Sequence, residues 1–467
     1  MNTHLDEPAY PKPAYAWYVV FMLFLAFTVS YIDRQIISLL VEPIKTDLGL
    51  SDTQIGLLQG FAFTVFYTFA GIPLGRLADK KNRKVIITVG MFLWSIMTAS
   101  CGLAKTFTHL FISRIGVGIG EASLSPAANS MITDYFPKDK RGKPVALYFM
   151  GVYVGVGLSF ILGGMVISMV SNAGAIVLPL VGELSAWQLT FMVVSLPGLL
   201  LVALMPTIKE PFRHGRITAD GKEVDTGVGA AKDFFFKHFK AYAIIFLGFG
   251  LAGSMAIGFF AWTTPLFTRI HGWETARIGY TFGTIVMVMG TLGIILGGAV
   301  ADRLLQKGQQ HAYIKVAIWA ILGAMVFAGT AAMVSNPYVA WALLCPAVAC
   351  FGMPVALAPA AVNHITPNQF RGQAIAIYIF VVGLINNNLG PISVGVLNDY
   401  VFKDPLAINR SMLTIAIFFG VVSSLILVWS IRFYNSSAEA IMGEARIADA
   451  QATNGLVDRT PGKSAEQ

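Results

Sequence analysis

Four charged residues stand inside stretches of the sequence that are otherwise apolar. Asp33 and Arg34 are neighbours in "TVSYIDRQIISLL", and Arg114 and Glu121 lie seven positions apart in "HLFISRIGVGIGEASLSP". Burying a charge among apolar groups is costly unless water or a group of opposite charge compensates it. We therefore expect Asp33 and Arg114 to form an ion pair in the wall of a water-filled cavity.

Glu121 follows Arg114 by two helical turns, about 10.5 Å, so both side chains lie on one face of a helix. Burial favours the neutral form of a carboxyl group, whereas a nearby guanidinium favours its charged form. A group held between these effects can exchange a proton near neutral pH. The proton site is expected at Glu121 or Asp33, with Arg114 as the responding partner; a static ion pair is the alternative. Arg34 points about 100° away from Asp33 and is expected to reach the outer edge or a neighbouring helix.

The elements that hold these residues are expected to be membrane-spanning helices. Of the 467 residues, 55% are hydrophobic and only 12% are charged, whereas a soluble domain carries roughly 25% charged residues. Apolar runs of about 20 residues recur from Trp17 to Phe433, each long enough to cross ~30 Å of hydrocarbon as a helix. They give about twelve spans, and the predicted fold class is an all-α membrane protein.

Helix geometry places Asp33 and Arg114 at similar depths in the membrane. If the first span starts at Trp17, Asp33 lies about 24 Å above its starting edge. The fourth span runs in the opposite direction from near Thr108, so Arg114 lies about 21 Å above that same edge. A direct contact between the two side chains is therefore expected.

Basic residues collect in alternate loops between the spans. "GRLADKKNRK" and "PKDKRGK" are strongly basic, whereas "EPIKTDLGLSD" on the other side is net acidic. By the positive-inside rule the basic loops are cytoplasmic, and both termini are expected there too. The formal net charge of +8 is then explained by the basic cytoplasmic loops of a membrane protein and does not indicate nucleic-acid binding. The N-terminal segment lacks the cationic head of a signal peptide, which fits a bacterial inner membrane.

The chain contains an internal repeat. Gly75 and Asp79 recur at the same spacing as Gly298 and Asp302, and "PKDKRGKPVALY" resembles "PNQFRGQAIAIY" at nearly the same offset. Two such matches indicate two parallel repeats of six spans each. The predicted units are a tail (1–14), a first bundle (15–206), a linker (207–240), a second bundle (241–434) and a second tail (435–467).

Further residues are expected to line the cavity between the bundles. "GLINNNLGPISVG" points the amides of Asn386, Asn387 and Asn388 in successive directions, so at least one faces the interior. The aromatic runs "GFAFTVFYTF" and "GFFAWTTP" suit an apolar wall of that cavity. The predicted substrate-binding residues are Arg114, Glu121, Asn386, Asn387, Tyr153, Phe66 and Trp262.

The loop between the second and third spans resembles the signature of the major facilitator superfamily, G-x-x-x-D-[RK]-x-x-[RK]-[RK], and the likeness extends along nearly the whole chain. It implies two pseudo-symmetric six-helix bundles that expose a central site alternately to each side. Acidic and basic groups of these loops would latch the cytoplasmic side in the outward-open state. The residues expected in this cytoplasmic gate are Gly75, Asp79, Arg83, Lys84, Arg141, Asp302 and Arg371.

Four segments, "YIDR", "DKKNRK", "GVGIGEASLSP" and "KEPFR", resemble the spinster family more closely, including Asn82 where many superfamily members have glycine. The resemblance implies a transporter of lysophospholipids or sphingosine-1-phosphate-like amphiphiles, proton-coupled in some members. It also implies that Asp33 is the acidic residue of the first span and that Arg114 and Glu121 are the charged pair of the fourth.

A proton-coupled symporter of small organic anions, of hexuronate or aromatic acid type, is the alternative, because that branch shares the Y-x-D-R and G-x-x-E-A patterns. An enzyme or a sensor is not expected. The seven histidines are scattered, and the three cysteines lie in apolar runs without metal-ligand or nucleophile–base spacing. We expect no cofactor and no metal, and a membrane-embedded monomer whose partners are its substrate and protons.

Overall fold

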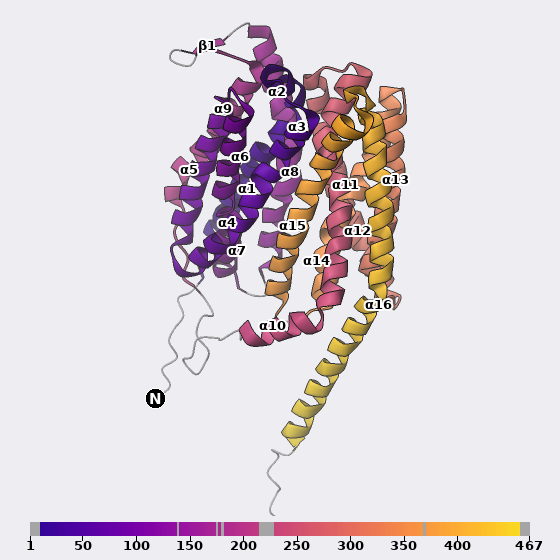
Figure 1. Cartoon of the computed structure of the whole chain (residues 1–467). Coiled ribbons are helices and arrows are strands. Elements are labelled where there is room, and N and C mark those ends of the chain that lie inside the picture. Colours follow the sequence, from indigo (N-terminus) through magenta and orange to yellow (C-terminus); the bar gives the residue numbers. More distant parts are fainter. Residues whose placement is uncertain are drawn as a thin grey trace, which may run out of the picture.

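The computed structural model describes residues 10–137, 140–173, 176–178, 182–213, 228–367 and 370–457. Its regular elements are helices apart from one short hairpin, which confirms the all-α membrane fold expected from the composition. Figure 1 shows long helices standing side by side, with the first half of the sequence on one side and the second half on the other.

The helices of the first half are α1 (Pro13–Gln35), η1 (Ile36–Ser38), α2 (Val41–Leu48), α3 (Asp52–Gln59), α4 (Phe61–Lys80), α5 (Arg83–Cys101), α6 (Phe107–Glu121), α7 (Leu124–Tyr135), α8 (Gly142–Ala173), α9 (Ala186–Leu204) and η3 (Met205–Thr207). Between α8 and α9, strands β1 (Ile176–Leu178) and β2 (Gly182–Leu184) pair antiparallel. The second half consists of α10 (Val228–Lys237), α11 (Phe239–His271), α12 (Thr275–Gln306), α13 (Ala312–Met333), α14 (Pro337–His364), α15 (Arg371–Val396), η5 (Leu397–Phe402), η6 (Pro405–Ala407) and α16 (Ile408–Val457).

Eleven helical segments of the described chain are long and apolar enough to cross a membrane. The predicted fourth span is divided into α6 and α7, because Ala122 and Ser123 interrupt the helix while keeping right-handed backbone angles. Together α6 and α7 run from Phe107 to Tyr135 and match the other spans in length. They complete the crossings predicted from the sequence.

Two spans of the first half break at the same level. α1 gives way to the 3-10 turn η1 after Gln35, and α3 ends at Gln59, one residue before α4 begins. Gly60 fits this break because a Cβ atom there would lie 2.4 Å from the carbonyl oxygen of Asn387 in α15. The last carbonyl groups of a helix lack intrahelical donors, so both breaks present acceptors inside the protein.

The two halves of the chain approach each other backbone to backbone. A Cβ atom on Gly157 of α8 would lie 2.7 Å from the carbonyl oxygen of Gly283 in α12, and one on Gly283 would lie 2.5 Å from that of Gly157. A Cβ atom on Gly56 of α3 would lie 2.8 Å from the carbonyl oxygen of Pro391 in α15. Small residues permit such close contacts between membrane helices, which makes α8–α12 and α3–α15 the main contacts between the halves.

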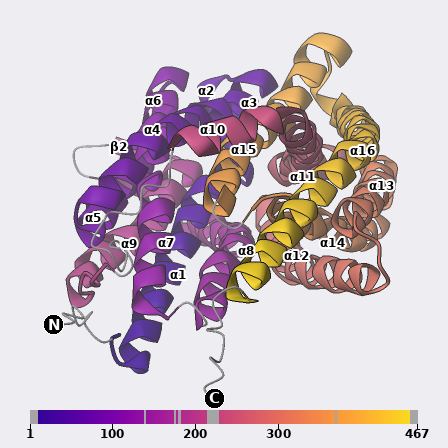
Figure 2. The same cartoon turned by 90° about the horizontal axis from the view of Figure 1, so that it is seen from below.

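We name the two ends of the molecule after the short helices found there. The α2 end, at the top of Figure 1, holds α2, the start of α3 and the β hairpin. The α10 end, at the bottom, holds α10 and the loops that follow α4, α7 and α14. Figure 2 views the molecule from the α10 end and shows α10 lying between the two halves, beside α15.

The predicted unit boundaries are not tested by this fold, but two observations refine them. The predicted linker (207–240) contains α10, and α11 begins at Phe239. α16 stays helical to Val457, beyond the boundary expected at 434. Residues 1–9, 214–227 and 458–467 of the predicted tails and linker lie outside the described residues.

Candidate functional site

Arg34 and Glu121 form a buried ion pair in the first half of the chain. Nη2 of Arg34 lies 2.8 Å from Oε2 of Glu121, and the Glu121 side chain is 1% exposed against 17% for Arg34. The guanidinium carbon of Arg34 lies 4.3 Å from the ring centre of Phe63 and 4.6 Å from that of Tyr31. Because aromatic faces attract cations, these rings and the carboxylate together hold Arg34 in place.

Arg114 binds main-chain carbonyl groups. Its Nη1 donates to the carbonyl oxygen of Asp33 at 3.2 Å, and its Nη2 donates to that of Arg34 at 3.2 Å. Its Nε donates to the carbonyl oxygen of Leu58 at 3.4 Å. These acceptors lie at the C-terminal ends of α1 and α3, where carbonyls are unpaired and the helix dipole attracts a cation. Arg114 therefore caps two helix ends at once.

The predicted ion pair between the Asp33 carboxylate and Arg114 is not formed. The two residues do meet at one depth, but through the main chain of Asp33. The Asp33 carboxyl group is fully buried beside Trp94 and Thr98 of α5, whose donors come close to its oxygens without reaching full hydrogen-bond geometry in the described part of the chain. The guanidinium fork of Arg114 instead fits two successive carbonyls at the end of α1, so Arg114 engages the main chain of Asp33 and not its carboxylate.

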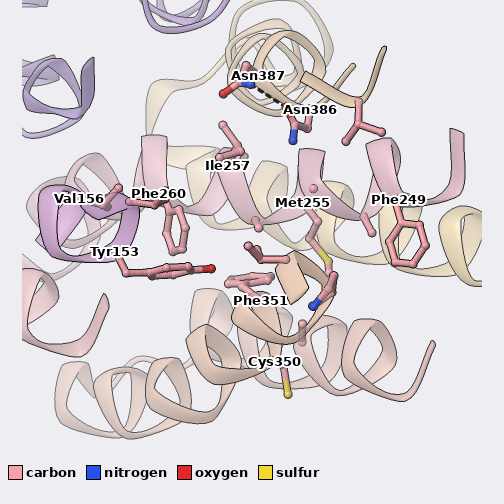
Figure 3. Close-up of a pocket in the computed structure, with 18 of the residues that line it drawn as sticks. Tyr153, Val156, Phe249, Met255, Ile257, Phe260, Cys350, Phe351, Asn386 and Asn387 are labelled. Atoms are coloured by element: carbon pink, nitrogen blue, oxygen red, sulfur yellow. Dashed lines mark hydrogen bonds between the residues drawn. The ribbon is translucent and has the colours of Figure 1, made fainter. Parts of the chain in front are cut away.

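A cavity of about 210 Å³ lies between the two halves, next to Arg34. Figure 3 shows many of the side chains that line it, including Tyr153, Phe260, Asn386 and Asn387. From the first half come polar Arg34 and Gln35 of α1 and the ring of Tyr153 from α8. The second half contributes a largely apolar wall that includes Phe249, Met255, Ile257, Phe260, Phe351 and Val382.

Asn386 and Asn387 are the amides that the second half presents to this cavity. Nδ2 of Asn387 donates to Oδ1 of Asn386 at 2.7 Å and to the carbonyl oxygen of Gly383 at 3.0 Å (Figure 3). Asn388 turns back to its own helix, where its Nδ2 donates to the carbonyl oxygen of Leu384 at 2.7 Å. Two of the three adjacent amides therefore border the cavity.

The residues predicted to bind substrate separate into two groups in space. Tyr153, Asn386 and Asn387 line the central cavity. Arg114 and Glu121 are not among its lining residues, and only 1% and 2% of their surfaces are exposed. They lie behind Arg34, which separates them from the cavity.

The two predicted aromatic residues lie elsewhere, which corrects the expectation for them. Trp262 is fully buried in α11, and its indole N–H donates to the carbonyl oxygen of Pro391 in α15 at 2.9 Å. Phe66 is half-buried on α4 and is absent from the cavity lining. The Trp262 ring packs between α11 and α15, which is the commoner role of buried aromatic side chains.

A smaller hollow of about 20 Å³ lies beside the cavity towards the α2 end. Arg34, Gln35 and Asn387 border both spaces. Gln59 of α3 also borders the hollow, and its Nε2 donates to the carbonyl oxygen of Ala261 in α11 at 3.3 Å. The Arg34 guanidinium is thus the cationic group that faces both spaces, with Glu121 behind it.

Asp52 joins the two halves at the α2 end. Nη1 and Nη2 of Arg269 from α11 lie 2.7 and 2.8 Å from its two carboxylate oxygens. Lys45 of α2 donates to the same carboxylate at 2.6 Å, and Nδ2 of Asn398 donates to it at 2.8 Å. A two-point contact between arginine and a carboxylate is among the strongest polar contacts in proteins.

Asp399 extends this contact from the second half. Its carboxylate oxygens accept hydrogen bonds from the main-chain N–H groups of Asp52 at 3.3 Å and Thr53 at 2.7 Å. These are the first N–H groups of α3, so the carboxylate caps that helix. We call the set of Lys45, Asp52, Arg269, Asn398 and Asp399 the Asp52 clasp.

The predicted gate residues at the α10 end behave differently. Arg83 pairs with Asp134 and, at 2.6 Å, with Glu210 in the segment that follows the first half. Nε of Arg141 donates to the carbonyl oxygen of Phe136 at 2.9 Å. Both arginines therefore bind groups that belong to the first half or directly follow it.

The remaining gate residues give the same picture. Nε of Arg371 donates to the carbonyl oxygens of Asn363 and Thr366, both at 3.2 Å and both in the second half. The main-chain N–H of Lys84 donates to Glu210, and the carbonyl of Asp79 accepts from Arg213; Gly75 is half-buried and Asp302 exposed. The hydrogen bonds described for Arg83, Arg141 and Arg371 therefore stay on their own side of the molecule, whereas the Asp52 clasp joins the two halves at the α2 end.

Sequence reasoning gave too little weight to Arg34 and did not find the Asp52 clasp. The signal for the clasp is present in the sequence. Asp52 opens the second span, and Arg269 lies in the last turn of the seventh, so both charges stand at the same membrane edge. Opposite charges at span ends on one side of a membrane are candidates for a contact between halves.

The curated proteins that are similar to this chain include three transport-related relatives. An MFS-type efflux pump of Mycolicibacterium smegmatis is 26% identical over 93% of this chain and 96% of its own length. Protein spinster of Drosophila melanogaster is 25% identical over 83% of this chain and 62% of its own length. A probable L-galactonate transporter of Escherichia coli is 28% identical over 62% of each chain.

The fold also matches a solved structure, that of a bacterial homologue of the human lysosomal transporter Spinster in an inward-facing and unoccupied conformation. The TM-score is 0.74 at 25% identity, and the match covers 93% of this chain and 99% of that chain. Residues 23–391 match the Major Facilitator Superfamily. These relatives are transporters and not enzymes. The chain therefore belongs to the major facilitator superfamily, as a spinster-like transporter.

Proposed function

We propose that this transporter moves a lysophospholipid or sphingosine-1-phosphate-like amphiphile across a bacterial inner membrane by alternating access, coupled to protons. The observation that carries the proposal is the make-up of the central cavity. Its lining combines the cationic Arg34 and the amides of Asn386 and Asn387 with a wall of apolar side chains. An amphiphile offers an anionic head to the first group and a hydrocarbon tail to the second.

We assign Arg34 to the head group of the substrate. A guanidinium binds a phosphate through two parallel N–H donors. Arg34 borders the cavity and is 17% exposed. Arg114, which the sequence favoured for this role, already donates to three carbonyl groups. Its proposed role is to hold the main chain of Asp33 and Arg34 in position.

We assign Glu121 to proton coupling. A phosphate bound to Arg34 competes with the Glu121 carboxylate for the same guanidinium. A buried carboxylate that loses its partner is strongly destabilised, and taking up a proton removes that charge. Substrate and proton are thereby linked at one ion pair. Asp33, whose buried carboxyl group forms no ion pair among the described residues, is the second candidate for a proton.

We assign the α10 end to the cytoplasm, together with both termini, because its loops carry the basic residues. The Asp52 clasp then closes the extracellular side. The residues predicted for the cytoplasmic gate would form their contacts between the halves in the opposite state. A network of ion pairs supplies a few kcal/mol of bias between two such states, and we propose that a monomer is sufficient for this motion.

Transport of a small organic anion is the second candidate, and the likeness to the L-galactonate transporter supports it. Arg34 would then hold a carboxylate and Glu121 the proton. The apolar wall of the second half, with Phe249, Phe260 and Phe351, gives no contact suited to a sugar acid. This wall favours the amphiphile.

Thermal unfolding of the purified protein separates the two candidates, because a ligand that binds the folded state raises its stability by mass action. We expect lysophosphatidylcholine and sphingosine 1-phosphate to raise the unfolding temperature above that in a chain-matched neutral detergent. The rise in unfolding temperature should vanish in Arg34→Gln. It should persist in the control variant Arg277→Gln, because Arg277 stacks on Trp273 and does not line the cavity. Stabilisation by galactonate or an aromatic acid alone would favour the organic anion, and a lipid response that survives Arg34→Gln would remove the head-group assignment.

A further inference from the structure

An apolar groove of about 470 Å³ lies where α10, α11 and α15 meet. Phe246 and Leu247 of α11 line one wall, and Ile377, Val381 and Ile385 of α15 line the other. The lining contains no charged side chain. Leu247 and Ile377 are 43% and 40% exposed, so the groove is open to the surroundings. From Phe239 to Leu247 it follows α11 for about 12 Å.

A second hollow of about 400 Å³ adjoins the groove at the start of α11. The two spaces share Phe236 and Phe239, which are 70% and 64% exposed. Lys237 and Lys240 line the second hollow. Within the described part of the chain no carboxylate lies within ion-pair distance of either ammonium group, and Asp233 on the same helix lines neither space.

The two hollows keep a fixed relation to each other because α10 is anchored to the second half. The ring of Phe234 stacks on Phe370 with 5.2 Å between centres, and that of Phe235 meets Tyr242 edge-on at 5.3 Å. Their neighbour Phe236 points away from this packing and stays exposed. α10 thus presents one aromatic face to the protein and leaves Lys237 at the mouth of the groove, near Lys240 of α11.

We propose that this corner binds an anionic phospholipid of the surrounding bilayer, with its phosphate between Lys237 and Lys240 and one acyl chain in the groove. Basic groups beside a membrane span attract anionic lipid head groups, and an apolar trough that starts at the same point suits the chain. The basic hollow thus matches the anionic head group of a lipid, and the uncharged groove matches its acyl chain.

This lipid site is separate from the central cavity. The two have no lining residue in common. The rings of Phe246 in the groove and Tyr378 in the cavity meet edge-on with 5.7 Å between centres and divide the spaces. The site therefore holds a bilayer lipid and not the transported molecule, and its existence does not depend on the proposed substrate.

Native mass spectrometry of the full-length protein, titrated with dioleoyl-phosphatidylglycerol or dioleoyl-phosphatidylcholine, tests the charged part of the site. Phosphatidylglycerol should bind preferentially, and Lys237→Gln/Lys240→Gln should weaken that binding about thirtyfold. Lys105→Gln/Lys307→Gln, which removes two exposed lysines elsewhere, should leave it unchanged. Equal binding of the two lipids, or unchanged binding in the first variant, would overturn the proposal.

A groove-filling variant tests the apolar part. Ala243→Phe should weaken phosphatidylglycerol binding about tenfold by occupying the space of the acyl chain; if it does not fold, Ile377→Phe fills the groove from α15 instead. Glycerol 1-phosphate, which has the head without the chain, should not displace the lipid. Displacement by glycerol 1-phosphate would show that the groove does not select the ligand. Displacement by lysophosphatidylcholine at equal concentration would show that the anionic charge does not select it.

Discussion

The two halves of this transporter repeat the same gate motif but differ at the level of the cavity. The first half holds Asp33, Arg34, Arg114 and Glu121 in its interior, whereas the second half faces the cavity with apolar side chains and two asparagines. Ion pairs inside one bundle keep their geometry while the bundles move against each other. The difference indicates that the charge chemistry belongs to one half and that the other half supplies a wall and a moving partner.

The largest expected effect comes from removing the carboxylate of Glu121. Glu121→Gln should reduce pH-gradient-driven uptake in proteoliposomes to background, because Arg34 loses its partner and the site loses its proton acceptor. Binding of the substrate should persist, since Arg34 becomes free for its head group.

Glu183→Gln is the matched control, because Glu183 is an exposed carboxylate on the hairpin. It should transport normally. Uptake by Glu121→Gln that keeps its full pH dependence would take the proton role away from this residue. The same measurement on Asp33→Asn decides whether the second buried carboxyl group of the first half takes part.

The next effect separates stability from transport within the first half. Arg114→Lys should lower the free energy of unfolding by about 2–4 kcal/mol, because a single ammonium group cannot cap the ends of α1 and α3 together. Denaturant titration in detergent measures this loss. Arg34→Lys should cost much less stability and act mainly on uptake. A fully stable Arg114→Lys that fails to transport would make Arg114 a transport group and not a helix cap.

A third variant loosens the contact between the halves. Asp52→Asn removes the charge that Arg269 and Lys45 share, and should raise the population open at the α2 end about tenfold. Labelling of Gln59→Cys, in a background without native cysteines, by a membrane-impermeant maleimide reports that opening. Asp47→Asn is the control, because Asp47 binds Ser185 and Trp187 within the first half. Equal labelling in both variants would mean that the clasp does not hold the α2 end closed.

The smallest effect is expected in the second half. Asn386→Leu should weaken binding of the substrate about fivefold and leave the pH dependence of uptake unchanged, since one neutral hydrogen bond is worth about 1 kcal/mol. Isothermal titration with lysophosphatidylcholine measures the affinity. Asn388→Leu, whose amide bonds its own helix, should change little. An altered pH profile in Asn386→Leu would show that the two halves share the proton chemistry.

The fold could be predicted because the lengths of the apolar runs, the charges of the loops and an internal repeat can all be read from the sequence. Counting residues along a span gives its depth in the membrane, and this depth correctly brought Asp33 and Arg114 to one level. Counting does not give the direction in which a side chain points. The breaks after Gln35 and Gln59 decide where Arg114 points, and nothing in the apolar runs marks them except Gly60.

The cavity lining was predictable to the same degree. The run of three asparagines required that some amide face inwards, and Asn386 and Asn387 do so. Trp262 could not be assigned from its type, because the acceptor of its indole N–H is the carbonyl of Pro391, far away in the sequence. Packing between distant segments decides whether an aromatic ring lines a cavity or fills a gap.

The glycine contacts between α8 and α12 offer a way to trap the conformation that is open at the α2 end. Gly157 and Gly283 bring the two backbones together without side chains between them. One methyl group placed at Gly283 would act as a wedge on the closed side of the molecule. Crystals of a Gly283→Ala protein are therefore a direct route to the state in which we propose that the cytoplasmic gate is assembled.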